Sequence, residues 1–188
     1  GPWQCAGCGS SHEASNFFCK VCGKVSGLQQ LEETHFGTLG LEAAFELDPK
    51  QLDSEYKERQ KLFHPDRHAQ ASGEQQEEVE RQSAQLNEAI HILRSPLLRA
   101  NYWMELHGVP VLVEEQRMQD MTTMMEVMEI NEEIDEAKTQ QEVDRLTEQT
   151  TAKVREVESK LADVFRQKDW VTARSLVERL QMLTRIGE

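Results

Sequence analysis

After residue 22 this sequence of 188 residues contains no cysteine, and nowhere does it contain an apolar run of about 18 residues, the length that crosses a membrane. Basic side chains are also few, with 21 Lys and Arg against 34 Asp and Glu, which gives a net charge of −13. This balance argues against a nucleic acid or an anionic membrane as a partner, because both attract a basic surface. No secretory signal or Arg-rich presequence is visible.

The acidic residues are unevenly distributed along the chain. Residues 112–136 contain nine carboxylates and one arginine, whereas residues 49–68 contain five Lys or Arg and four acidic side chains. We therefore expect a basic surface that faces one partner and an acidic surface that faces another.

Helical patterns dominate after about residue 35, so the expected fold class is mainly α. Asp48, Ser95 and Asp169 are predicted N-caps, the first two because a proline follows each of them. Short joints between the last three helices favour an antiparallel three-helix bundle. The predicted helices span about residues 38–47, 49–63, 73–93, 96–107, 114–137, 140–165 and 170–183.

All four cysteines lie in two Cys-x-x-Cys pairs that ten residues separate. Two such turns can place four thiolates tetrahedrally around one ion, and soft sulfur ligands suit Zn²⁺ or iron. Four sulfurs leave no open position, so we expect a structural metal, preferably zinc, that holds together about 22 residues with little apolar core. Two disulfides or free thiols in a disordered tail are the alternatives. His12 could be a ligand only by displacing a cysteine, so it is expected at the surface. The predicted ligands are Cys5, Cys8, Cys19 and Cys22.

A His-Pro-Asp tripeptide at residues 64–66 lies between two amphipathic helical patterns. Its proline breaks a helix, which predicts a turn, and the preceding helix carries three basic residues within five positions. A short helix, a basic helix, this tripeptide and a further helix together resemble the J-domain family, co-chaperones that stimulate ATP hydrolysis by chaperones of the DnaK class. An ordinary turn beside a solvated helix face is the alternative. The resemblance implies chaperone contacts by His64, Pro65, Asp66, Lys57, Arg59 and Lys61.

Residues 118–136 carry apolar side chains on two sides of one predicted helix. At about 100° per residue, Val127, Ile130 and Ile134 form one stripe, and four methionines form another beside three glutamates. A bundle helix needs only one core face, so the methionines either pack under another element or bind a partner. Methionine suits a partner surface because its side chain is flexible and polarisable. Met182 similarly lies opposite the core stripe of the last helix.

The stretch Met128–Glu136 resembles the segment of HscB-type J-proteins that binds the iron–sulfur scaffold protein IscU. Some animal members of that family also carry a four-cysteine module before the J-domain, so the resemblance covers nearly the whole chain. It implies scaffold contacts by Met124, Met125, Met128, Glu129, Glu132, Glu136 and Met182.

The implied protein is an adaptor without catalytic residues, not an enzyme. By resemblance it binds an IscU-type scaffold, delivers it to a DnaK-class mitochondrial chaperone and stimulates that ATPase to promote cluster transfer. The expected compartment is the mitochondrial matrix, with the cytoplasm as a second one. A general J-protein for unfolded clients and a thiol- or metal-handling redox protein are the alternatives, and homo-oligomers stay open. The expected domains are a zinc-ribbon-like module with its linker (1–35), a J-domain (36–108) and a scaffold-binding C-terminal bundle (109–188).

Overall fold

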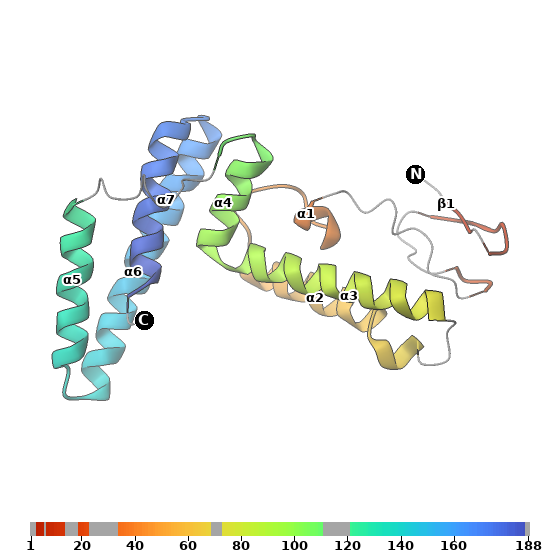
Figure 1. The fold of residues 1–188 in the computed structure, drawn as a ribbon, viewed down its shortest axis with the longest axis horizontal. Helices are drawn as coiled ribbons and strands as arrows, with labels where there is room; N and C mark the ends of the chain where they lie inside the picture. The colour runs from red at the N-terminus through yellow and green to blue at the C-terminus, as the bar shows by residue number, and fades with distance from the viewer. Residues whose placement is uncertain are drawn as a thin grey trace. The chain divides into compact units, whose positions relative to one another are not determined.

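The structure is a computed structural model that describes residues 3–5, 7–13, 19–22, 34–68, 73–110 and 121–186. Within these ranges the chain is mainly helical, as predicted, with one small β-hairpin (Figure 1). The chain forms two compact units, Gly1–Arg94 and Ser95–Glu188. None of the described helices is long and apolar enough to cross a membrane.

Two short strands form the hairpin of the first unit. β1 (Trp3–Gln4) pairs antiparallel with β2 (Ser11–His12). In the turn between them, the Cys5 N–H donates to the Ser10 carbonyl at 2.9 Å, and Gly9 adopts a left-handed φ of +72°. Glycine adopts this conformation without strain, so the turn can close tightly around the first cysteine pair.

The predicted helix over residues 38–47 is wrong. The structure instead has a single helical turn, α1 (His35–Thr38), which ends before Gly40 because Gly40 adopts a left-handed φ of +67°. The spacing of apolar residues after it resembled a helix, but Leu39 and Phe45 are buried from an irregular segment. Burial, rather than helix formation, explains the apolar pattern there.

Three further segments complete the described part of the first unit: α2 (Pro49–Leu62), the 3₁₀ turn η2 (Pro65–His68) and α3 (Gly73–Arg94). Asp48 caps α2 as predicted, because its carboxylate accepts from the Lys50 N–H at 2.9 Å. α1 and α2 both pack on α3 (Figure 1). The core side chains are Phe36, Leu39, Phe45, Leu52, Phe63, Val79, Leu86, Ala89, Ile90 and Leu93.

α4 (Pro96–Leu106) belongs to the second unit, because it packs against α7 (Trp170–Thr184). Ser95 caps it as predicted, and Gly108, with a φ of +70°, follows its end. The packing therefore divides the chain between residues 94 and 95, whereas the domain boundary predicted from the sequence lies between residues 108 and 109.

The rest of the second unit is the predicted three-helix bundle of α5 (Met121–Glu136), α6 (Gln140–Arg166) and α7, with short antiparallel connections (Figure 1). Asp169 caps α7, as expected. The predicted start of α5 near residue 114 lies outside the described residues. Apolar side chains of α6 and α7 form the core: Leu146, Val157, Leu161, Ala162, Phe165, Ala173, Val177, Leu180 and Leu183.

Candidate functional site

The sulfur atoms of the four predicted ligands, Cys5, Cys8, Cys19 and Cys22, all lie within 4.8 Å of one another. Cys5 Sγ lies 3.5 Å from Cys22 Sγ, and Cys8 Sγ lies 3.4 Å from Cys19 Sγ. Both separations exceed the disulfide bond length of about 2.05 Å, so neither pair is disulfide-bonded. The four cysteines are therefore positioned to bind a metal ion, and their all-sulfur donor set suits zinc or iron.

The first cysteine of each pair receives backbone hydrogen bonds that favour its thiolate. Burial raises the pKa of Cys19, but hydrogen bonds from Ser10 and from the N–H groups of Cys22 and Val21 outweigh it and lower that pKa to about 5. Burial also raises the pKa of Cys5, and hydrogen bonds that include the Gly7 N–H lower it overall. Thiolates are the form that binds metal, so the folded module is prepared for an ion.

The expectation of a surface position for His12 is wrong. His12 is only 8% exposed, and its Nε2 lies 3.2 Å from Cys19 Sγ and 2.7 Å from Ser10 Oγ. Ser10 Oγ also contacts the sulfurs of Cys8 at 2.9 Å and of Cys19 at 3.2 Å. No sequence motif pointed to these two residues; only the pairing of β1 with β2 brings them to the sulfur cluster.

The His-Pro-Asp tripeptide follows α2, and its Pro65 and Asp66 are the first two residues of η2. Phe63, 2% exposed, anchors the end of α2 in the core, whereas the side chains of His64 and Asp66 are 54% and 90% exposed. The Asp66 N–H lies 3.3 Å from His64 Nδ1, and its carboxylate lies 3.5 Å from the same atom. His68 Nε2 is 2.8 Å from the Leu62 carbonyl oxygen and ties η2 back to the helix. The turn thus presents polar groups on a firmly attached loop.

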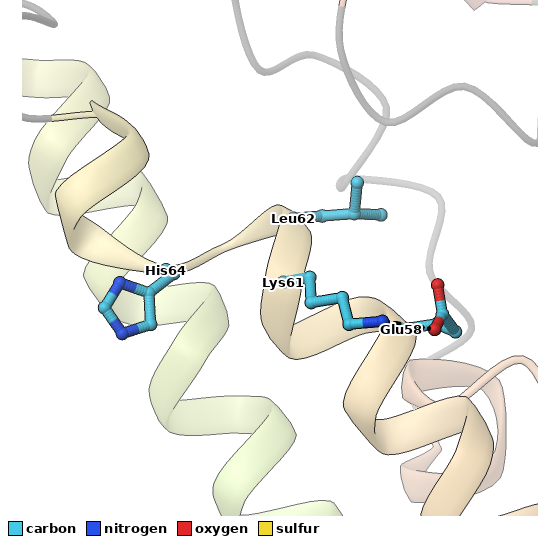
Figure 2. Close-up of a pocket in the computed structure, with 4 residues that line it drawn as sticks. All are labelled: Glu58, Lys61, Leu62 and His64. Atoms are coloured by element: carbon cyan, nitrogen blue, oxygen red, sulfur yellow. Dashed lines mark hydrogen bonds and ion pairs between the residues drawn. The ribbon is translucent and has the colours of Figure 1, made fainter.

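The three predicted basic contacts lie in two different environments. Lys57 and Lys61 are exposed and four residues apart, so they share one face of α2. Lys61 pairs with Glu58 at 2.7 Å beside an open depression of 430 Å³ that His64 also lines (Figure 2). The side chain of Arg59 is only 14% exposed, and a Cβ at Gly40 would lie 1.7 Å from its Nη2. Arg59 therefore packs against the loop after α1.

We define the tripeptide surface as Lys57, Lys61, His64 and Asp66, and Pro65 stays a predicted chaperone contact. Arg59 also stays a predicted chaperone contact, but of the three predicted basic contacts it is Lys57 and Lys61 that are exposed to solvent.

The methionine stripe of α5 is exposed, and the helices of its own unit do not cover it. Exposed fractions are 39% for Met124, 67% for Met125 and 56% for Met128. Glu129, Glu132 and Glu136 are exposed on the same helix. The opposite stripe, which contains Ile130 and Ile134, is half-buried. We define the methionine surface as Met124, Met125, Met128, Glu129, Glu132 and Glu136.

Polar contacts fix α5 to the other two bundle helices. Arg179 of α7 donates to Thr123 Oγ1 at 3.1 Å and to Glu126 Oε2 at 3.0 Å, and Lys153 of α6 pairs with the same glutamate. Thr123 is fully buried, so α5 is held in one rotation about its axis. That rotation turns the methionines outward. Met182 lies about one turn beyond Arg179 and is half-buried.

A groove of 590 Å³ also lies in the second unit. Its lining includes Ile134 of α5, Val143 and Val154 of α6 and Leu183 of α7. The residues around it include none of the seven predicted scaffold contacts. The predicted scaffold site is therefore an exposed helix face rather than this groove.

The chain is similar to known proteins over nearly its whole length. Residues 119–188 match the family model of the HSCB C-terminal oligomerisation domain. The chain is 32% identical over 184 residues to an Arabidopsis thaliana protein named iron-sulfur cluster co-chaperone protein HscB homolog, covering 97% of this chain and 72% of that one. The crystal structure of human co-chaperone protein HscB superimposes with a TM-score of 0.77 at 26% identity and covers 97% and 94% of the two chains. Chaperone HscB from Vibrio cholerae gives 0.69 at 31% identity, covering 81% of this chain and 92% of its own.

Proposed function

Because this chain belongs to the HscB family of co-chaperones, we propose that it binds an IscU-type iron–sulfur scaffold and delivers it to a DnaK-class chaperone. It then stimulates ATP hydrolysis by that chaperone, which promotes transfer of the cluster. The exposure of Met124, Met125 and Met128 on a helix whose other contacts hold it in a bundle is the observation that carries the proposal.

The chaperone contact is assigned to the tripeptide surface. His64 and Asp66 are exposed on a loop that Phe63 and His68 anchor, so their side chains can contact a partner protein without any rearrangement of the helices. In this proposal the chaperone carries out the hydrolysis. This chain contributes only contacts that favour one conformation of the chaperone. Lys57 and Lys61 add electrostatic attraction that is sensitive to salt.

The scaffold contact is assigned to the methionine surface, with Met182 as a further predicted contact. Three exposed methionines on one helix face offer an adaptable apolar area, and three glutamates beside them favour a partner with basic groups. This is the helix-in-groove type of recognition, in which the anchors recur at helical spacing.

The metal of the cysteine module is proposed to be Zn²⁺, held by Cys5, Cys8, Cys19 and Cys22, with iron as the other candidate. When bound, the ion supplies the cross-link that keeps the module folded, because four thiolates leave no position for chemistry. The module has no catalytic part in this proposal. The proposed compartment is the mitochondrial matrix. We also propose self-association through the C-terminal bundle, which the description of the matched family supports.

The test is single-turnover ATP hydrolysis by a mitochondrial DnaK-class chaperone, with and without the IscU-type scaffold. The protein is compared with His64→Gln and with Met128→Ala/Glu132→Ala, and Met121→Ala serves as a control because Met121 is exposed but is not a predicted contact. We expect stimulation to require His64, and the extra stimulation by scaffold to require Met128 and Glu132.

Two results would decide against the proposal. Stimulation that survives His64→Gln would remove the J-domain role. A scaffold effect that is absent from every protein, together with tight binding of unfolded polypeptides, would favour a general J-protein with other clients.

A further inference from the structure

The two cysteine pairs are alike in sequence spacing but not in their surroundings. Cys5 and Cys19 are each the first cysteine of a pair, and they are 2% and 3% exposed. Each sulfur accepts from the backbone N–H two residues further on, Gly7 or Val21, at 3.3 Å. Only Cys19 of the two has the Ser10 hydroxyl and the His12 imidazole described beside its sulfur. The four-cysteine centre is therefore asymmetric, with these two extra polar side chains next to Cys19.

The position of His12 is fixed by the hairpin rather than by chance contact. β2 contributes Ser11 and His12, and the latter lies opposite Trp3 of β1. The side chain is 8% exposed, and its Nε2 is held between Ser10 Oγ at 2.7 Å and Cys19 Sγ at 3.2 Å. A buried imidazole that two polar groups orient is well placed to act as a donor.

The His12 imidazole lies close enough to the Cys19 sulfur to take its place as a ligand. A nitrogen about 2.05 Å and a sulfur about 2.3 Å from one tetrahedral Zn²⁺ lie about 3.6 Å apart. The 3.2 Å separation of His12 Nε2 from Cys19 Sγ is close to this value. If the Cys19 sulfur were absent, the imidazole would need to move by no more than this separation to occupy its place. Three cysteines and one histidine form an ordinary zinc ligand set.

We propose that His12 is a reserve ligand of the metal centre. With all four cysteines present it contacts the Cys19 sulfur from outside the ligand sphere, and when the Cys19 thiolate is lost it replaces that ligand. The Cys5 side has no such reserve among the described residues, so loss of Cys5 should release the metal.

The test uses the full chain and Co²⁺, whose absorption reports the number of thiolate ligands. Cys19→Ala is compared with Cys5→Ala, a matched loss of an equally buried first cysteine. We expect Cys19→Ala to bind one Co²⁺ with about three-quarters of the wild-type thiolate charge-transfer absorption, because three thiolates remain. Its affinity should exceed that of Cys5→Ala by at least about tenfold. Adding His12→Gln, which keeps a polar side chain in the hairpin, should lower the affinity of Cys19→Ala to that of Cys5→Ala.

The control is His12→Gln alone, which should keep the four-thiolate spectrum and so show that the module still folds. Equal Co²⁺ affinities of Cys19→Ala and Cys5→Ala would overturn the proposal. No further loss on adding His12→Gln to Cys19→Ala would also overturn it. A wild-type spectrum that already contains a nitrogen ligand would overturn it as well, because His12 would then be a resident ligand rather than a reserve.

Discussion

The tripeptide surface and the methionine surface are built in different ways. The first is a polar loop tip whose exposed side chains, His64 and Asp66, extend from a turn that the buried Phe63 anchors. The second is an apolar helix face that remains exposed because Arg179 and Glu126 fix the rotation of α5. A polar tip depends on the identity of a few groups, whereas an apolar face depends on area. The two surfaces should therefore respond differently to substitution and to salt.

The largest expected effect is on the tripeptide surface. Asp66→Asn keeps the shape of the side chain but removes its charge, and we expect it to reduce chaperone stimulation by at least about tenfold, or about 1.4 kcal/mol of barrier. Scaffold affinity should not change. Single-turnover ATP hydrolysis and a separate scaffold titration measure the two properties.

Asp53→Asn is the matched control for this substitution, because Asp53 is an exposed α2 carboxylate that pairs with Arg94 away from the tripeptide. If both variants lose stimulation equally, general charge rather than the tripeptide is responsible.

The next effect is on the methionine surface. Met125→Ala/Met128→Ala removes two side chains that are 67% and 56% exposed, so folding should be little affected. Binding of the scaffold should weaken by about 10- to 100-fold if both are interface anchors. Calorimetric titration with the scaffold gives the affinity. Met121→Ala, 64% exposed, should bind within about twofold of the original protein. If Met121→Ala weakened scaffold binding as much as Met125→Ala/Met128→Ala, the binding site would not be confined to the methionine surface.

A smaller effect concerns the support of α5 rather than its exposed face. Arg179→Met breaks the contacts with Thr123 and Glu126 and leaves polar groups at the helix interface less well paired. We expect the free energy of unfolding to fall by about 1–3 kcal/mol, measured by urea denaturation. Arg166→Met, which removes an exposed pair with Asp163, should cost less than about 1 kcal/mol. Equal costs would show that α5 is not held by Arg179.

The smallest effect is the response to salt. Lys57→Ala/Lys61→Ala should weaken the chaperone interaction by only about two- to fivefold at low salt, because exposed charges contribute little to affinity and more to the rate of encounter. Raising NaCl from about 50 mM to about 300 mM should remove that difference. Association rates measured by stopped flow would contradict this view if the lysine variant kept the full salt dependence.

Local signals in the sequence were sufficient for most of the helices. Asp48, Ser95 and Asp169 cap helices as predicted, since a capping side chain acts on its own next two or three residues. The helix expected over 38–47 failed because apolar spacing alone cannot distinguish a helix from a loop that buries Leu39 and Phe45.

Some features of the candidate sites could likewise be predicted from local sequence signals, and others could not. The four cysteines and the second, methionine-rich stripe could be predicted, because ligand spacing and apolar periodicity are properties of the sequence. Whether that stripe is covered or exposed was left open, and the structure shows it exposed. The burial of His12 and the packing of Arg59 against Gly40 could not, because both depend on segments that meet only after folding. Long-range contacts of this kind have no local sequence signal.

The proposed function requires that one chain carry both surfaces. The most direct measurement is a mixing experiment with His64→Gln, which should lack chaperone stimulation, and Met125→Ala/Met128→Ala, which should lack scaffold binding. Single-turnover ATP hydrolysis is measured with scaffold present for each variant and for their equimolar mixture. We expect the mixture to show no more scaffold-dependent stimulation than the second variant alone. Recovery of the stimulation given by the original protein would contradict the account, because the two surfaces would then act without being joined in one chain.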